Sequence, residues 1–146
     1  MNEPTPAPAD GLAAGLAAEY ALIYAYGRAG VELGDKAALD IAADAENTHR
    51  DLRDRLTEYM AGLGQLPPPP EAAYTVVDPL TNEGEAVALL TKLEDATAAT
   101  WRTVVSATAG DDRRHAVDGL SNAATRAAVW RRWRGEQKAA ATFPGA

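Results

Sequence analysis

Three side chains of the kinds that bind metal ions stand out in this sequence, and two of them are one helical turn apart. Glu46 and His49 form a Glu-x-x-His step, and Glu19 lies in an earlier helical stripe of apolar residues. Four-helix bundles can hold two metal ions with a glutamate from each of two helices and a Glu-x-x-His step from each of the other two. Glu19, Glu46 and His49 therefore form half of such a ligand set, and iron or manganese is the metal it would take.

The composition limits the classes of protein to which the chain can belong. Its 146 residues suit one domain, and the lack of cysteine excludes disulfides, zinc–thiolate sites and thiol nucleophiles. Fourteen basic against 21 acidic residues give a net charge of -7, which argues against nucleic acid as a partner. No apolar run approaches the roughly 20 residues of a membrane span, and the first ten residues lack a secretory signal. We therefore expect a cytoplasmic protein with no membrane partner.

Apolar stripes at helical spacing predict four helices, over about residues 11–33, 36–63, 83–108 and 112–134. Residues 1–9 carry three prolines and are expected to form a disordered tail, which leaves a helical domain over 10–135 and a C-terminal tail over 136–146. The stripes predict a shared core of Leu12, Leu16, Ile23, Leu52, Leu56, Leu90, Leu93, Trp101, Val104, Val117 and Leu120.

The segment between the second and third helices is long and rich in proline. It covers 64–81, and Pro67 to Pro70 form a short polyproline rod that cannot be helical. At about 3.3 Å per residue this segment can reach from one end of a bundle to the other. The sequence therefore predicts an all-α, ferritin-like four-helix bundle, in which two antiparallel helical hairpins are joined by a long Pro-rich crossover.

Distances along the first hairpin place two of the candidate ligands together. Glu19 lies fifteen residues before the turn near Gly34, and His49 lies fifteen residues after it. An antiparallel hairpin puts such residues at the same height, so their side chains are expected to meet inside the bundle. Glu46 is one turn from His49 and is expected to border the same site.

A shift of about 75 residues relates the two hairpins. It maps Glu19 onto Glu94, but it maps Glu46 and His49 onto Ser121 and Ala124, which cannot replace a carboxylate and an imidazole. Glu94 lies at the border of its stripe, where glutamate usually reaches solvent. The second half of a di-metal site is therefore predicted to be missing.

Several segments resemble a known family. They are residues 16–27 (LAAEYALIYAYG), 49–54 (HRDLRD), the 67–74 linker, and 93–95 (LED) followed by 101–102 (WR). On these segments, over about residues 10–135, the chain resembles the actinobacterial ferritin-like proteins of the DUF4439 family. The resemblance implies a ferritin-like bundle of bacterial, cytoplasmic origin, and it implies no activity and no catalytic residue.

Two interpretations of the half-site remain open. In the first, Glu19, His49 and Arg53 form a buried polar network with no cofactor, and the protein is a non-catalytic binding or oligomeric interaction protein without a complete di-metal site. In the second, a homodimer brings together two copies of Glu19, Glu46 and His49 and forms an iron-handling or oxidative di-metal enzyme. We prefer the first, since three ligands from one chain lack their opposing partners. Both predict a homo-oligomer, most simply a dimer, and neither identifies another protein partner.

The last predicted helix ends in a run of tryptophan and arginine, Trp130 to Arg134. Alternating basic and aromatic residues are typical of anion or nucleic-acid sites. They also suit the last turn of a helix, where cations interact favourably with the helix dipole and tryptophan covers the end of a bundle. The acidic charge of the whole chain favours the second explanation.

Overall fold

A computed structural model describes residues 8–71, 74, 79–137, 139–140 and 143–146 of the chain. The described residues form four α-helices and contain no strand. The helices are α1 (Pro8–Gly30), α2 (Lys36–Gly62), α3 (Glu83–Ala107) and α4 (Gly110–Trp133). The four predicted helices are thus present. The first begins earlier than predicted, because proline is readily accepted in the first turn of a helix and Pro8 extends α1 into the expected tail.

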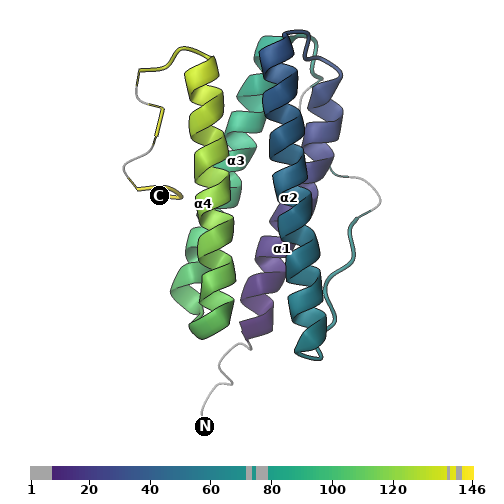
Figure 1. Ribbon diagram of the computed structural model, residues 1–146, viewed down its shortest axis with the longest axis vertical. Coiled ribbons are helices and arrows are strands. Elements are labelled where there is room, and N and C mark those ends of the chain that lie inside the picture. The colour runs from purple at the N-terminus through teal and green to yellow at the C-terminus, as the bar shows by residue number, and fades with distance from the viewer. Residues whose placement is uncertain (1–7, 72–73, 75–78, 138, 141–142) are drawn as a thin grey trace.

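The helices stand side by side, with α1 and α4 running in one direction and α2 and α3 in the other (Figure 1). Hydrogen bonds at the two ends of the bundle fix this order. The backbone N–H groups of Gly34 and Asp35 donate to Glu83, so α2 and α3 begin at the same end. At the other end Tyr59, near the end of α2, donates to Asp112, near the start of α4. The end of α2 and the start of α3 therefore lie at opposite ends of the bundle, and part of the predicted 64–81 crossover lies outside the described residues.

Side chains that cap helices explain where α2 and α3 begin. The Asp35 carboxylate accepts a hydrogen bond from the Ala38 backbone N–H, and Asn82 accepts one from the N–H of Glu85. Glu85 in turn accepts from the backbone N–H and the hydroxyl of Thr81. These contacts satisfy backbone donors that the first turn of a helix leaves unpaired.

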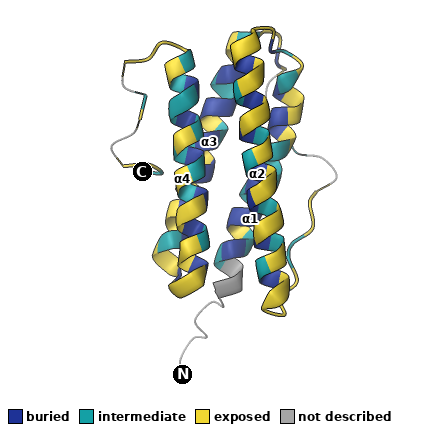
Figure 2. Cartoon of the chain, in the orientation of Figure 1, coloured by how far each residue is buried: buried dark blue, intermediate teal, exposed yellow. Residues whose placement is uncertain are grey.

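The buried side chains form two apolar clusters along the bundle axis, and its outer face is exposed (Figure 2). One cluster contains Leu22, Tyr26, Leu90 and Trp130 among its larger members. The other contains Leu12, Leu16, Leu52, Leu56, Met60 and Trp101. Glu19, His49 and Glu94 are also fully buried but belong to neither cluster.

The face that α4 turns inward differs from the predicted one. Val117 is 43% exposed, and the buried positions of α4 are Asp112, Ala116, Gly119, Ala123, Ala127 and Trp130. Ile23, Leu93 and Leu120 are half-buried, whereas the other predicted core residues are buried. The error in α4 has a simple cause: this helix packs small residues inward, and its larger aliphatic side chains suggested a stripe displaced by one residue.

Part of the predicted C-terminal tail packs on the bundle. Gly145 lies against the backbone of α3 so closely that an added Cβ would be 2.6 Å from the carbonyl oxygen of Ala98. Its φ of 78° is also one that glycine adopts readily and other residues rarely do. Among the described helices, none has the length and apolar character needed to cross a bilayer.

Candidate functional site

The centre of the bundle holds an imidazole between two carboxylates. Nδ1 of His49 lies 2.6 Å from Oε2 of Glu19, and Nε2 of the same ring lies 2.9 Å from Oε1 of Glu94. All three side chains have no exposed surface. The contact between Glu19 and His49 is the one expected from their equal distances to the first turn.

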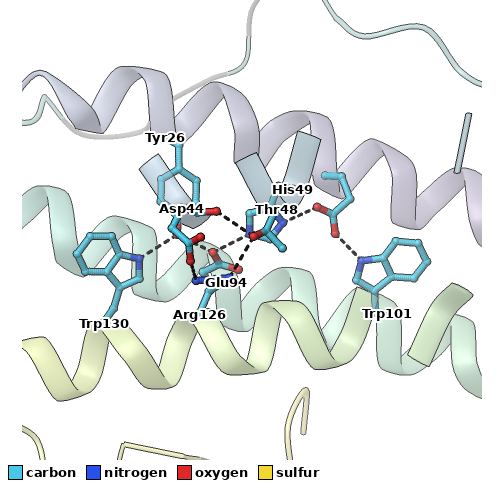
Figure 3. A network of polar contacts seen from close by, with 9 residues as sticks. Tyr26, Asp44, Thr48, His49, Glu94, Trp101, Arg126 and Trp130 are labelled. Atoms are coloured by element: carbon cyan, nitrogen blue, oxygen red, sulfur yellow. Dashed lines mark hydrogen bonds and ion pairs between the residues drawn. The ribbon is translucent and has the colours of Figure 1, made fainter. Parts of the chain in front are cut away.

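Aromatic side chains donate further hydrogen bonds to the two carboxylates (Figure 3). Nε1 of Trp101 donates to Oε1 of Glu19 over 2.7 Å, and the Tyr26 hydroxyl donates to Oε1 of Glu94 over 2.6 Å. Nε1 of Trp130 donates to the Tyr26 hydroxyl over 2.9 Å. We call Glu19, Tyr26, His49, Glu94, Trp101 and Trp130 the core network, to which every helix contributes at least one side chain.

The contacts of α1 and α3 in the core network are reciprocal. Glu19 and Tyr26 are seven residues apart on α1, and Glu94 and Trp101 are seven residues apart on α3. The aromatic residue of each helix donates to the glutamate of the other. The 75-residue relation between the hairpins therefore includes the aromatic donors as well as the glutamates.

Small residues make room for the largest of these donors. The Trp101 ring lies against Gly15 of α1 and Gly119 of α4. A Cβ added to Gly15 would lie 2.1 Å from the ring, and one added to Gly119 would lie 2.4 Å from it. Only glycine at these two positions allows Trp101 to cross the core and reach Glu19.

The electrostatics of the site favour a positively charged His49. Burial alone lowers the pKa of this ring, but its hydrogen bonds to Glu19 and Glu94 and the charges of those carboxylates raise the pKa to about 10. An imidazolium donates from both nitrogens, as two carboxylate partners require. Burial raises the pKa of the Glu94 carboxyl, and burial together with the nearby Glu94 charge raises the pKa of Tyr26 well above its ordinary value.

Two predicted site residues lie outside the core network. The Glu46 carboxylate is partly exposed and accepts a hydrogen bond from Arg50, which lies one turn later on α2, over 2.7 Å. Arg53 donates to its neighbour Asp54 over 2.8 Å instead of joining Glu19 and His49. Both side chains bond to residues of α2 itself, so being one turn from His49 does not place them in its network.

Glu94 and three aromatic residues were missed as members of the site. Glu94 was expected to reach solvent, but it is fully buried and bonded to His49 and Tyr26. The signal that identifies it is the repeated seven-residue spacing of glutamate and aromatic donor in α1 and α3. Trp130 belongs to the core network rather than to an anion site, and its neighbour Trp133 donates to the capping residue Asp35.

The donor set does not fit the predicted metal half-site. A histidine binds a metal ion through an unprotonated ring nitrogen, and both nitrogens of His49 face carboxylate oxygens at hydrogen-bonding distance. Glu46, the third predicted ligand, is bonded elsewhere. Within the described part of the chain, no three carboxylate or imidazole side chains are arranged to hold a metal ion.

Comparisons with known proteins give a family but no activity. None of the curated proteins matches the chain. A solved structure, described as a conserved hypothetical protein from Mycobacterium tuberculosis, is similar with a TM-score of 0.81 and 30% sequence identity. The similarity covers 94% of this chain and 96% of the mycobacterial chain. The profile of the family described as "Domain of unknown function (DUF4439)" matches residues 11–146. The chain therefore belongs to the DUF4439 family.

Proposed function

We propose that this protein is a ferritin-like bundle of actinobacterial type that acts as a non-catalytic binding or oligomeric interaction protein in the cytoplasm. The core network would then take the central place that a di-metal centre takes in metal-binding relatives of this architecture. The observation that carries the proposal is the pairing of both ring nitrogens of His49 with carboxylates. A ring held in this way stabilises the fold through charge and hydrogen bonds and offers no lone pair to a metal or substrate.

The order of the helices supports the ferritin-like part of the proposal. Two antiparallel hairpins whose second and third helices run in the same direction require one long connection, as ferritin-like folds have. The glutamates Glu19 and Glu94 lie at related positions of the two hairpins and meet at the centre of the bundle, joined by His49. This is where a ferritin-like protein places its metal ligands.

Burial argues against an enzyme whose site is completed across a homodimer. Glu19 and His49 have no exposed surface, and their side chains are bonded to α3 of the same chain. A shared di-metal site needs these groups to face the partner subunit. Glu46 is the most accessible of the three predicted ligands, and it is engaged by Arg50.

A metal titration tests the proposal. Protein purified without chelators is subjected to elemental analysis, and its melting temperature is followed as iron(II) or manganese(II) is added. We expect substoichiometric metal and an unchanged melting temperature. A melting temperature that rises with the logarithm of metal concentration, with about one equivalent of metal recovered per chain, would contradict the proposal.

The Glu46→Gln variant separates the two interpretations further. Glu46 lies outside the core network, so this change leaves the network intact in a metal-free protein. If Glu46 is instead a ligand in a shared di-metal site, the variant loses the metal-dependent stabilisation of the wild type.

Light scattering on the same samples measures the oligomeric state, for which we expect a dimer. A protein that stays monomeric at high concentration would contradict self-association.

A further inference from the structure

The two buried glutamates differ in how well their oxygens are satisfied. Both oxygens of Glu19 accept hydrogen bonds, one from Trp101 and one from His49. Glu94 receives both of its donors, Tyr26 and His49, on Oε1. Among the described residues, its buried Oε2 atom has no hydrogen-bond partner. A carboxylate oxygen without a donor is costly in a protein interior, so this atom marks a place where a donor is expected.

Arg126 of α4 carries a buried N–H donor that, among the described residues, also has no hydrogen-bond partner. Arg126 donates from one terminal nitrogen to Asp44 and from the other to the Thr48 hydroxyl, and these contacts connect α4 to α2. Its Nε atom is buried, and within the described part of the chain this N–H finds no acceptor. The guanidinium therefore has its outer edge bonded near the surface and one inward donor still unpaired.

Several observations place these two atoms in the same part of the core. Trp101 of α3 contacts Gly119 of α4, and these two helices are antiparallel. Glu94 lies seven residues before Trp101, and Arg126 lies seven residues after Gly119. Glu94 and Arg126 are therefore at similar heights in the bundle. The charge of Arg126 also acts on the Tyr26 hydroxyl, which lies 2.6 Å from Glu94. Figure 3 shows the Arg126 side chain extending from α4 toward Glu94 and the residues around His49.

The second hairpin carries a small side chain at the position that corresponds to His49. The buried positions of α2 and α4 correspond at a spacing of 74 residues, as for Ala42 and Ala116 or Ala45 and Gly119. At this spacing the counterpart of His49 is Ala123, which is fully buried. A methyl group therefore stands on α4 where the first hairpin carries an imidazole.

We propose that Glu94 Oε2 and Arg126 Nε bind one internal water molecule, which joins Arg126 to the core network. The water accepts from Nε and donates to Oε2, so one molecule satisfies both unpaired atoms. Each helix then supplies one ionisable side chain to a single connected set: Glu19, His49, Glu94 and Arg126. The set then contains two carboxylates, an imidazolium and a guanidinium whose outer edge also pairs with Asp44. The inference rests on the metal-free role proposed above.

A crystal structure at atomic resolution tests the water site directly. We expect electron density for one water molecule within hydrogen-bonding distance of both Glu94 Oε2 and Arg126 Nε. The same density should remain in Asp44→Asn, which weakens the outer contact of Arg126 but leaves Nε unchanged, and should be lost in Arg126→Met. A direct Nε–Oε2 hydrogen bond in the wild type, or no density between the two atoms, would overturn the proposal.

Nuclear magnetic resonance gives an independent answer that needs no change to Arg126. A bound water produces a cross-peak between the Arg126 Nε proton and the water resonance, with the sign of a molecule that tumbles with the protein. The cross-peak should persist in Thr48→Val, which removes a neighbouring hydroxyl that can relay exchange to solvent. Its absence in metal-free wild-type protein would overturn the water site alone. A metal-dependent melting temperature would instead overturn the proposed function, whatever this spectrum shows.

Discussion

The two helical hairpins reach the centre of the bundle with different chemistry. The α1–α2 hairpin contributes Glu19 and the only histidine of the core network, whereas the α3–α4 hairpin contributes Glu94 and two tryptophans. At the position that corresponds to His49, the second hairpin has Ala123. One imidazole therefore bonds to the carboxylates of both hairpins.

This difference shows how a repeated scaffold can keep its buried carboxylates without a second histidine. The second hairpin has no imidazole among the core network; its Trp101 crosses the core against Gly15 and Gly119 and donates to the glutamate of the first hairpin. The first hairpin thus supplies the imidazolium to which both glutamates bond, and the second supplies the two large indole rings that pack around the site. Changes to the first should act mainly through electrostatics, and changes to the second mainly through packing.

Removing His49 should have the largest effect. His49→Ala takes the imidazolium from between Glu19 and Glu94 and leaves two buried carboxylates facing each other, which we expect to lower the free energy of unfolding by about 3–5 kcal/mol. Urea denaturation of wild type and variant at neutral pH measures this loss of stability. His115→Ala is the matched control, because that ring is partly exposed and stacks on Tyr59 outside the core network. Its expected cost is about 1 kcal/mol.

The effect of His49→Ala should depend on pH in a defined direction. The pKa of His49 is about 10 in the folded protein and 6.5 for the unperturbed ring, so the folded state binds the proton more tightly. Its contribution to stability is complete below about pH 6.5 and is lost as the pH rises toward 10. The gap in stability between wild type and variant should narrow over that range. A gap that widens with pH would contradict a protonated His49.

Exchanging each glutamate for glutamine should lower the free energy of unfolding to a different extent in the two hairpins. In Glu19→Gln the amide nitrogen must face either Trp101 or His49, both of which donate, so we expect a loss of about 2–3 kcal/mol. In Glu94→Gln the amide oxygen can keep both donors while the amide nitrogen takes the place of Oε2, and we expect a loss of about 1 kcal/mol. Thermal and chemical unfolding compare the stabilities of the two variants. A larger loss in Glu94→Gln than in Glu19→Gln would contradict the assigned contacts.

A methyl group added beside Trp101 should disturb the packing of the second hairpin. Gly119→Ala gains helix propensity but forces a methyl group into the indole ring, for a net loss of about 1–2 kcal/mol. Gly27→Ala on α1 is the control, since an added Cβ meets no atom within 4 Å there, and it should stabilise the protein by about 0.5–1 kcal/mol. Equal effects of the two changes would show that Trp101 does not depend on Gly119.

The sequence predicted features that depend on helix geometry. Apolar stripes and capping residues identified four helices, and equal distances to the first turn placed Glu19 beside His49. Such predictions succeed because helical rise and periodicity are nearly constant. The inward face of α4 was mistaken because Ala116, Gly119 and Ala123 carry little apolar bulk to mark it.

The membership of the site was harder to predict, because it depends on side-chain direction across helices. Arg53 and Glu46 lie one turn from His49, yet each finds a partner on α2 itself. Glu94 looks like a surface glutamate until Tyr26 of α1 and His49 of α2 are known to reach it. Pairings between helices that are distant in sequence leave no periodic signal, except where a spacing is repeated in both hairpins.

The protonation state of the His49 ring tests the central claim most directly. Nitrogen-15 chemical shifts of the ring report each nitrogen separately and can be followed from pH 6 to pH 9 in metal-free protein. A buried imidazolium between Glu19 and Glu94, with a pKa of about 10, keeps both nitrogens protonated over this whole range. A ring nitrogen that is unprotonated at pH 7 would contradict this account and would leave His49 a lone pair with which to bind a metal ion.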